Sequence, residues 1–372
     1  MRPEDGSLVP AAAEVDHAWI RRHLGWRLTG HETIDVRSIS HSDGMMGSVH
    51  QVRCGERSFV LKGPPDDRSE WGNLLTDIGR REVELYRYLA ARGPAAPKVS
   101  PDCHWSALGP DGLGALALED VGPPAGFART MATGLGRSAA AAAVRCLALF
   151  HAASARRGAD PLAPPYPWLY SARSDALVAA VRMGLDELPR LAADFAPDGP
   201  SAGTLRALRE LDVARTLGGS HTTGAIVSLC HGDCWAANVL FTPAGAAPER
   251  QRALLIDWQF AMWGNPLTDV ALFLLSSLAP EARRAWQDDL LGIYRTTLTE
   301  HCELVYPAQE CRADYDRALP FAGLVALATL EDYLNGMSPA ERQGFAGRVR
   351  DFADAGLRRS SGEVYGTVPR AV

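Results

Sequence analysis

The chain has 372 residues and a mass of 40.0 kDa, and 47% of its residues are hydrophobic, so it is long enough to bury more than one core. Its net charge of −6 argues against nucleic acid as a partner, because binding to phosphates requires a basic surface. The sequence shows no apolar leader and no apolar run long enough to cross a bilayer, and its seven cysteines have no regular spacing. We therefore expect a cytoplasmic protein without a membrane partner.

The first motif is a glycine-containing loop between two β-type segments, residues 34–39 and 49–53. Gly44, Gly47 and the small Ser48 allow the backbone of this loop to bend closely over phosphate groups. An ordinary hairpin turn has a similar composition, so the prediction depends on the position of the loop ahead of the next strand.

That next strand, residues 58–62, is apolar and ends in Lys62, for which a solvated surface lysine is the alternative. Residues 80–90 then carry apolar positions at helical spacing, which predicts a helix with one buried face. Two acids of this helix, Glu82 and Glu84, are candidate partners for Lys62. For either acid the alternative is a surface ion pair with Arg87.

Prolines at 94 and 97 end that helix, and residues 114–122 are predicted to form a strand that ends in two acids and a glycine. Further helices are expected over residues 138–154, 175–195, 203–217, 280–302, 310–334 and 339–357. The second and third of these lie in a proline-punctuated insert of about 156–224.

The most informative motif follows the insert. His231, Asp233 and Asn238 have the spacing His-x-Asp-x4-Asn, and Asp257 closes an apolar run that follows them. Kinases arrange a base and two metal ligands in this order. The apolar runs at 225–230, 239–241 and 253–256 read as buried strands, so these polar residues fall at strand ends.

Phosphoryl transfer explains these residue types. The carboxylate of Asp233 can accept the proton of an attacking hydroxyl, and the oxygens of Asn238 and Asp257 are hard ligands suited to Mg²⁺. Cys230, His231 and Cys234 also suggest zinc, but no second Cys or His pair accompanies them, so this reading is disfavoured.

Residues 230–241, 255–259 and 265–277 together resemble the ecdysteroid kinase-like branch of the aminoglycoside phosphotransferase and choline kinase superfamily. Trp235, after the loop aspartate, and Gln259, after the metal aspartate, are similar to that branch in particular. The resemblance implies an α+β, bilobal, protein-kinase-like fold. A small antiparallel-sheet N-lobe would occupy residues 1–120 and bind the nucleotide. A larger, mainly helical C-lobe would occupy 121–372.

The resemblance also implies cofactors and roles. ATP would be the phosphoryl donor, with GTP as the alternative, together with Mg²⁺. Lys62 would pair with Glu82, with Glu84 in reserve, and would hold the nucleotide phosphates. The backbone of the interlobe hinge would meet the adenine edge, and this hinge comprises Glu119, Asp120 and Val121.

Two residues would support the catalytic loop. They are His231 within it and Asp269, which opens a helix, where a carboxylate can also cap backbone N–H groups. In the resembling enzymes the insert and the C-terminal helices build the pocket for the acceptor, a small-molecule alcohol.

The acceptor is the least determined feature. The insert balances its acids with arginines, whereas a polycationic acceptor requires a dense acidic wall. We therefore expect a neutral or weakly charged alcohol, such as a steroid-like, nucleoside, sugar-like or antibiotic natural-product hydroxyl. The alternatives are an aminoglycoside-type resistance kinase, a non-catalytic nucleotide-binding scaffold, and a protein kinase, disfavoured by the missing Ala-Pro-Glu segment. Monomer and homodimer both remain open.

Overall fold

The computed structural model describes residues 14–39, 47–64, 72–109, 112–122, 133–242, 251–334 and 337–358, with the backbone alone for 72–76 and 332. The chain divides into two compact units, each described here by itself. Unit 1 comprises Met1–Pro123, Tyr166–Leu169 and Leu254–Ala261, and unit 2 comprises Pro124–Pro165, Tyr170–Ala253 and Met262–Val372. Asp257 thus belongs to unit 1, whereas the sequence assigned all residues after 120 to the C-lobe.

Unit 1 contains a five-stranded antiparallel sheet in the order β1-β2-β3-β5-β4. Its strands are β1 (Ile34–Ser38), β2 (Ser48–Cys54), β3 (Arg57–Gly63), β4 (Cys103–Leu108) and β5 (Gly114–Glu119). In the β3 to β5 register, Leu61 lies opposite Ala117 and Lys62 opposite Leu116. Because side chains alternate between the faces of a sheet, Leu61 and Ala117 share one face, and Lys62 and Leu116 share the other.

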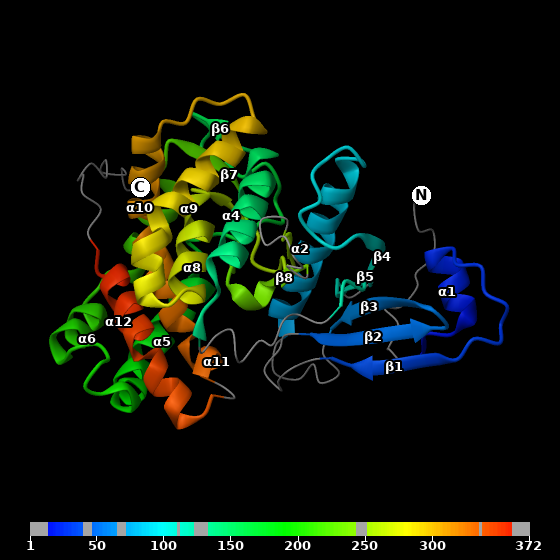
Figure 1. Ribbon diagram of the computed structural model, residues 1–372, viewed down its shortest axis with the longest axis horizontal. Helices are drawn as coiled ribbons and strands as arrows, with labels where there is room; N and C mark the ends of the chain where they lie inside the picture. Colours follow the sequence, from blue (N-terminus) through cyan, green and yellow to red (C-terminus); the bar gives the residue numbers. More distant parts are fainter. Residues whose placement is uncertain are drawn as a thin grey trace, which may run out of the picture. The chain divides into compact units, whose positions relative to one another are not determined.

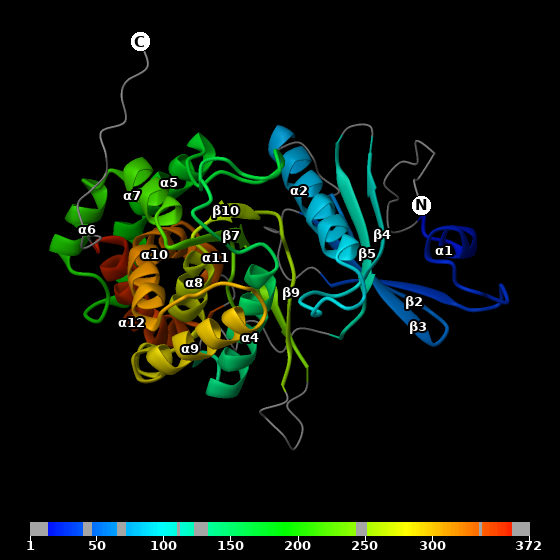
Figure 2. The same cartoon turned by 90° about the horizontal axis from the view of Figure 1, so that it is seen from above.

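The helices α1 (His17–Leu24) and α2 (Gly72–Ala91) lie on opposite sides of this sheet (Figure 2). Ile20 of α1 packs into the apolar cluster that contains Leu61 and Ala117. The carboxylate of Asp16 accepts the N–H of Trp19 at 2.7 Å and so caps the start of α1. Helix α2 therefore covers the face that carries Lys62, which positions the candidate partners of this lysine.

Unit 2 is mainly helical. Its helices are α4 (Arg137–Ala152), α5 (Asp175–Ala192), α6 (Ala202–Arg209), α7 (Val213–Thr222), α8 (Leu267–Ser277), α9 (Pro280–Glu300), α10 (Ala308–Ala328), α11 (Leu330–Leu334) and α12 (Pro339–Gly356). Helix α8 is buried along its whole length, where it packs against α4, α9, α10 and α12 (Figure 1). An amphipathic pattern is absent from α8 for that reason.

Short elements surround the candidate catalytic loop. The strands β6 (Arg156–Arg157), β7 (Ile226–Cys230) and β10 (Met262–Gly264) form a three-stranded sheet in the order β10-β7-β6, and every residue of β7 is buried. The 3₁₀ turn η3 (Ala236–Asn238) leads into β8 (Val239–Phe241), and β9 (Ala253–Leu255) leads to Asp257. A second 3₁₀ turn, η2 (Ala193–Phe195), extends α5.

The predicted fold class is confirmed: the structure is α+β, with an antiparallel sheet in unit 1 and a larger helical unit 2. The helix expected over residues 203–217 is instead two helices, because the chain leaves α6 at Glu210 and Asp212 caps a new helix, α7. The helix expected over 310–334 likewise divides at Thr329 into α10 and α11. Within the described residues, no helix combines the length and the apolar character needed to span a bilayer.

Candidate active site

A three-membered ionic cluster lies in unit 1. The ammonium nitrogen of Lys62 is 2.9 Å from the carboxylate of Glu82 and 2.8 Å from Oδ1 of Asp257. The side chains of these three residues are 18%, 6% and 15% exposed. Glu84 forms a half-exposed pair with Arg87 at 3.3 Å, so Glu82 is the acid of α2 that meets Lys62.

The charges of this cluster explain its pKa shifts. Burial raises the pKa of Glu82, and the neighbouring Asp257 raises it further, against the opposing effect of Lys62. Burial would lower the pKa of Lys62, but the two carboxylates raise it above its ordinary value. Both shifts favour bound protons because two carboxylates and one ammonium carry a net charge of −1. The cluster is therefore suited to an additional cation.

Two glycines bring α2 close enough for this contact. A Cβ atom on Gly79 would lie 2.7 Å from the backbone nitrogen of Gly114, which opens β5. A Cβ atom on Gly114 would overlap with the carbonyl group of Gly79. The helix backbone therefore lies directly on the strand at this point, one turn before Glu82. The sequence analysis did not predict this contact.

The loop after β9 holds Asp257 in an uncommon backbone conformation. Asp257 has a φ of 66°, the left-handed region that non-glycine residues rarely adopt and that aspartate tolerates best. The carboxylate of Glu82 accepts the backbone N–H of Trp258, the next residue. Trp258 is itself fully buried. The conformation of Asp257 is thus held by its own ion pair with Lys62 and by the hydrogen bond of the following residue, Trp258, to Glu82.

The glycine-containing loop is only partly described. Gly44 lies outside the described residues, and Gly47 lies just before β2. The hydroxyl of Ser48 donates to the carbonyl oxygen of Pro64 at 3.0 Å, which ties the start of β2 to the end of β3. The hydroxyl of Ser48 therefore has a structural partner, and the predicted place of Ser48 in a phosphate-binding loop stays a prediction.

The predicted hinge follows β5. The backbone N–H of Glu119 donates to Asp102 at 2.8 Å, and its carboxylate pairs with Lys98 at 2.6 Å. The carboxylate of Asp120 accepts the side-chain amide of Gln51 at 2.7 Å. Both acidic side chains therefore position the backbone here. The side chain of Val121 is 38% exposed.

In unit 2, Asp233 and Asn238 face each other across the candidate catalytic loop. The amide nitrogen of Asn238 donates to the backbone oxygen of Asp233 at 2.8 Å and to its Oδ2 at 3.0 Å. Because both acceptors are oxygens, the amide oxygen of Asn238 must point away from Asp233. The η3 turn brings Asn238 back to Asp233, five residues earlier in the chain. The amide nitrogen of Asn238 therefore orients the Asp233 carboxylate, while its amide oxygen, a hard ligand, points away from it.

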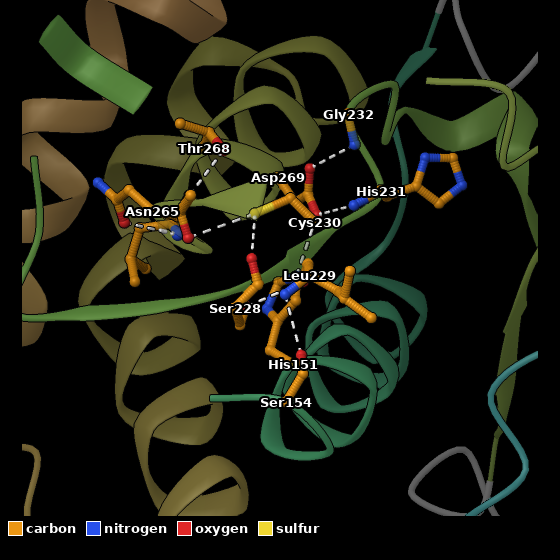
Figure 3. Close-up of polar contacts among 12 residues, drawn as sticks. His151, Ser154, Ser228, Leu229, Cys230, His231, Gly232, Asn265, Thr268 and Asp269 are labelled. Carbon is orange, nitrogen blue, oxygen red and sulfur yellow. Dashed lines mark hydrogen bonds and ion pairs between the residues drawn. The ribbon is translucent and has the colours of Figure 1, made fainter. Parts of the chain in front are cut away.

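A buried carboxylate supports this loop from behind (Figure 3). Asp269 accepts the backbone N–H of His231 at 2.5 Å and that of Gly232 at 2.9 Å. It also lies 3.0 Å from Nε2 of His151, whose other ring nitrogen meets the hydroxyl of Tyr294 at 2.9 Å. The first N–H of α8, that of Leu267, donates to the side chain of Asn265 at 3.0 Å, and the printed contacts of Asp269 go to the loop and to His151. Its contacts are those of the loop brace that the resemblance implied.

Asp269 remains ionised for a specific reason. Burial alone would raise its pKa, but the hydrogen bonds from His151 and Gly232 and the nearby imidazoles hold the pKa below its ordinary value. The ring of His231 points away from Asp269 (Figure 3) and its Nδ1 accepts the backbone N–H of Asp233 at 3.3 Å. The loop is therefore held through its backbone, while the amide of Asn238 orients the carboxylate of Asp233.

His151 is fully buried in the last turn of α4, and its contact with Asp269 was not predicted. A fully buried histidine inside the alanine-rich α4 was the available signal, because such a ring needs hydrogen-bond partners. Within the described residues, no group of three or more His, Cys, Asp and Glu side chains is placed to hold a metal ion, as a zinc site would require. Burial raises the pKa of both Cys230 and Cys234, so these thiols are packed in the core as neutral groups.

The proposed metal ligands divide between the two units, Asn238 in unit 2 and Asp257 in unit 1. Their joint coordination of one ion therefore stays a prediction. Each ligand presents the type of oxygen that Mg²⁺ prefers.

Comparison with known proteins supports the motif-based resemblance. Residues 202–306, which contain the catalytic motif and Asp257, match the model of the Ecdysteroid kinase-like family. No protein with a curated description is significantly similar to the chain. Among solved structures, APH(2")-IIia in complex with GDP and kanamycin has a TM-score of 0.52 at 14% identity, over 90% of this chain and 97% of that chain.

Two further solved structures have lower TM-scores. Spectinomycin phosphotransferase APH(9)-Ia, in complex with ADP and spectinomycin, has a TM-score of 0.46 at 13% identity, over 91% of this chain and 96% of that one. An ethanolamine kinase of Plasmodium vivax has a TM-score of 0.44 at 11% identity, over 91% and 88%. The segment with the candidate catalytic motif is thus similar to the ecdysteroid kinase-like family, and 90% of the chain is similar in fold to APH(2")-IIia.

Proposed function

We propose that this protein is an ATP- and Mg²⁺-dependent phosphotransferase that acts on a hydroxyl group of a small molecule. The observation that carries the proposal is the bridge from Lys62 to Glu82 and Asp257, at 2.9 and 2.8 Å. It unites a pair that the sequence selected for the nucleotide phosphates, Lys62 and Glu82, with a residue that it selected for the metal, Asp257, which lies 195 positions from Lys62 in the chain.

The donor set fits a nucleotide with a divalent cation. The cluster of Lys62, Glu82 and Asp257 carries a net charge of −1, which a cation neutralises. Carboxylate and amide oxygens, from Asp257 and Asn238, are suitable ligands for Mg²⁺. When bound, Mg²⁺ would offset the negative charge of the transferred phosphoryl group. Lys62, fixed by Glu82, would direct its ammonium to the nucleotide phosphates.

Asp233 would orient the attacking hydroxyl and accept its proton. Its carboxylate is aligned through Oδ2 by the amide of Asn238. The loop beneath it is held by the two N–H bonds to Asp269. Such preorganisation is what phosphoryl transfer needs from a protein, since positioning and electrostatics supply most of the catalysis.

The acceptor is proposed to be a neutral or weakly charged alcohol. Several acids of the insert and the C-terminal helices are already paired with arginines, as in Glu187 with Arg190 at 2.7 Å and Asp288 with Arg312 at 2.5 Å. These acids are thereby less available to an ammonium-rich acceptor. The half-buried ring of Trp235, two residues after Asp233, packs edge-on against Tyr333 at 4.6 Å and offers an apolar wall for a ring-shaped alcohol.

Calorimetric titration with ATP and with GTP, each with and without Mg²⁺, tests the nucleotide half of the proposal. We expect binding of one nucleotide that strengthens with Mg²⁺. If the wild type binds nucleotide with the same affinity with and without Mg²⁺, the proposed enzymatic function is contradicted and a non-catalytic scaffold is favoured.

A panel of alcohols, scored for phosphorylated product by mass spectrometry, tests the acceptor half. The panel should include steroids, nucleosides, sugars and aminoglycosides, with Asp233→Asn as the matched inactive control. Product from a neutral alcohol in the wild type alone is the expected result. Turnover of aminoglycosides in preference to neutral alcohols would replace the proposed acceptor class with the aminoglycoside-type kinase.

A further inference from the structure

Arg81 is a buried cation of α2 that the proposed mechanism does not use. Only 6% of its surface is exposed, although it lies beside Glu82 in the helix and next to the exposed Arg80. Its Nε donates to the backbone oxygen of Trp168 at 3.0 Å, and its Nη1 donates to the backbone oxygen of Gln259. A buried guanidinium requires such acceptors, because desolvation would otherwise be costly.

The two acceptors of Arg81 come from two separate segments of unit 1. Gln259 belongs to the loop that carries Asp257, and Trp168 belongs to the segment Tyr166–Leu169, which we call the strap. The strap also packs on α2 through Tyr166, whose ring lies 5.8 Å from that of Tyr88. The planar, forked guanidinium can hold two carbonyl groups at fixed positions, which a lysine ammonium cannot do as well.

Three consecutive residues of the loop are therefore held by neighbouring side chains. The carboxylate of Asp257 meets Lys62, the N–H of Trp258 donates to Glu82, and the carbonyl of Gln259 accepts from Arg81. Two adjacent residues of α2, Arg81 and Glu82, thus form hydrogen bonds with two adjacent residues of the loop. These bonds follow directly after Asp257, whose backbone is left-handed.

We propose that Arg81 is a positioning residue. By binding the carbonyl groups of Gln259 and Trp168, it holds the loop and the strap against α2 and so orients the carboxylate of Asp257 for the metal. The proposal rests on the proposed function, because it assigns Asp257 to Mg²⁺. It extends that function to a residue that touches neither nucleotide nor metal. Groups that hold a metal ligand in place contribute about 10- to 100-fold to metal affinity or activity.

Arg81→Lys keeps the charge and removes the fork, and Arg81→Met removes both. Arg80→Lys is the matched control, since it makes the same change one residue away at an exposed site. For Arg81→Lys we expect the Mg²⁺ concentration at half-saturation, measured by nucleotide-binding calorimetry, to rise about 10- to 100-fold. Nucleotide affinity without Mg²⁺ should stay within about twofold of the wild type, and Arg80→Lys should match the wild type in both measurements.

Hydrogen exchange without any ligand separates this inference from the proposed function. In Arg81→Lys, amides of residues 255–261 and 166–169 should exchange faster than in the wild type, while those of β2 should not change. A variant that melts at a lower temperature but keeps the wild-type Mg²⁺ half-saturation and exchange would overturn the inference. If the wild type itself binds no Mg²⁺ with nucleotide, the proposed function fails, and the exchange pattern still decides whether Arg81 locks the loop. Should Arg81→Met not fold, the Arg81→Lys result stands alone.

Discussion

The two units support their functional carboxylates in opposite ways. In unit 1 a cation, Lys62, holds the carboxylate of Asp257, and the cluster is partly exposed with an excess negative charge. In unit 2 an anion, Asp269, holds the backbone of the loop that carries Asp233, and this anion is only 1% exposed. An ionic cluster near the surface can exchange partners with a ligand, whereas a fully satisfied buried carboxylate has a structural role. Substitutions should therefore separate activity from stability in unit 1 and lower both together in unit 2.

The largest effect is expected for Asp233→Asn. Turnover should fall about 10²- to 10⁴-fold, because the amide cannot accept the proton of the hydroxyl. Binding of nucleotide with Mg²⁺ should remain, since Asp233 is assigned to the acceptor hydroxyl and neither to the nucleotide phosphates nor to the metal. Steady-state kinetics and calorimetry on the same preparation measure both quantities. A variant with wild-type turnover would refute the assignment of the base.

Lys62→Met should abolish the bridge in unit 1. We expect turnover to fall about 10²- to 10³-fold, the range found when one charge-stabilising donor is removed. The melting temperature should change little near pH 6, with Arg87→Met as a control that removes a surface cation of the same region. A loss of stability as large as the loss in Asp269→Ala would contradict the contrast between the two units.

The pH dependence of Lys62→Met sharpens this prediction. The pKa of Glu82 is raised by burial and by Asp257, and loss of the ammonium removes the one opposing charge. A carboxyl group whose pKa is raised on folding binds its proton more tightly in the folded state. Stability of the variant relative to wild type should therefore increase as the pH falls through the raised pKa toward 4.5. Denaturant titrations between pH 5 and 8 measure this slope.

Asp269→Ala should lower stability and activity together. It leaves the N–H groups of His231 and Gly232 and the ring of His151 without their acceptor in the core. Breaking a buried charged interaction of this kind costs about 3–5 kcal/mol. Chemical denaturation should register that loss, and Asp289→Ala, at a 63% exposed surface pair with Arg137, should register less than about 1 kcal/mol. Equal losses of unfolding free energy in the two variants would contradict the role of Asp269 in supporting the loop.

The Gly114→Ala change tests how α2 is seated. The new methyl group would overlap with the carbonyl of Gly79 and push the helix away from β5, one turn before Glu82. We expect about 1–3 kcal/mol of destabilisation and a loss of activity larger than that destabilisation explains. Gly292→Ala in α9, where a Cβ meets open space, is the matched control and should be neutral or stabilising. Wild-type activity in Gly114→Ala would show that α2 tolerates displacement.

The sequence suggested candidate chemical residues more directly than it suggested their supports. Lys62, Asp233, Asn238 and Asp257 were selected because phosphoryl transfer dictates such types and spacing along the chain, and their roles stay predictions. The choice of Glu82 over Glu84 needed the face of α2, which covers the Lys62 side of the sheet. Apolar periodicity also predicted most of the larger helices.

Residues that act through backbone atoms were not predictable in the same way. Arg81 meets carbonyl groups 87 and 178 positions away, and Gly79 meets Gly114, so neither partner leaves a local pattern. The small size of Ser48 suggested a place in a phosphate-binding loop, which stays a prediction, but gave no sign that its hydroxyl bonds the backbone of Pro64. The division of residues 203–217 into α6 and α7 depended on Asp212, whose capping role competes with helix continuation.

The smallest predicted effect concerns His221, buried beside the α8 brace. Burial lowers its pKa to about 4, against the opposing charge of Asp269, and its ring stacks on Phe321 at 5.3 Å. Between pH 6.5 and about 4 the unfolded chain therefore binds a proton that the folded chain does not, so stability is lost as the pH falls through this window. A pKa shift of this size corresponds to a loss of about 3 kcal/mol in the free energy of unfolding once the pH is below the lowered pKa.

His221→Phe should remove that part of the pH dependence, because phenylalanine keeps the stacking and cannot take up a proton. At pH 7 the variant loses the hydrogen bonds of the His221 ring, which include the 3.3 Å contact of Nδ1 with the hydroxyl of Thr268, and each costs about 1 kcal/mol. Its unfolding free energy should thus lie below the wild type at pH 7 and meet or exceed it near pH 4.5. Curves that stay parallel over this range would show that His221 does not cause this pH dependence, and Asp269 would not account for it, because its lowered pKa places its own loss of stability below pH 3.8.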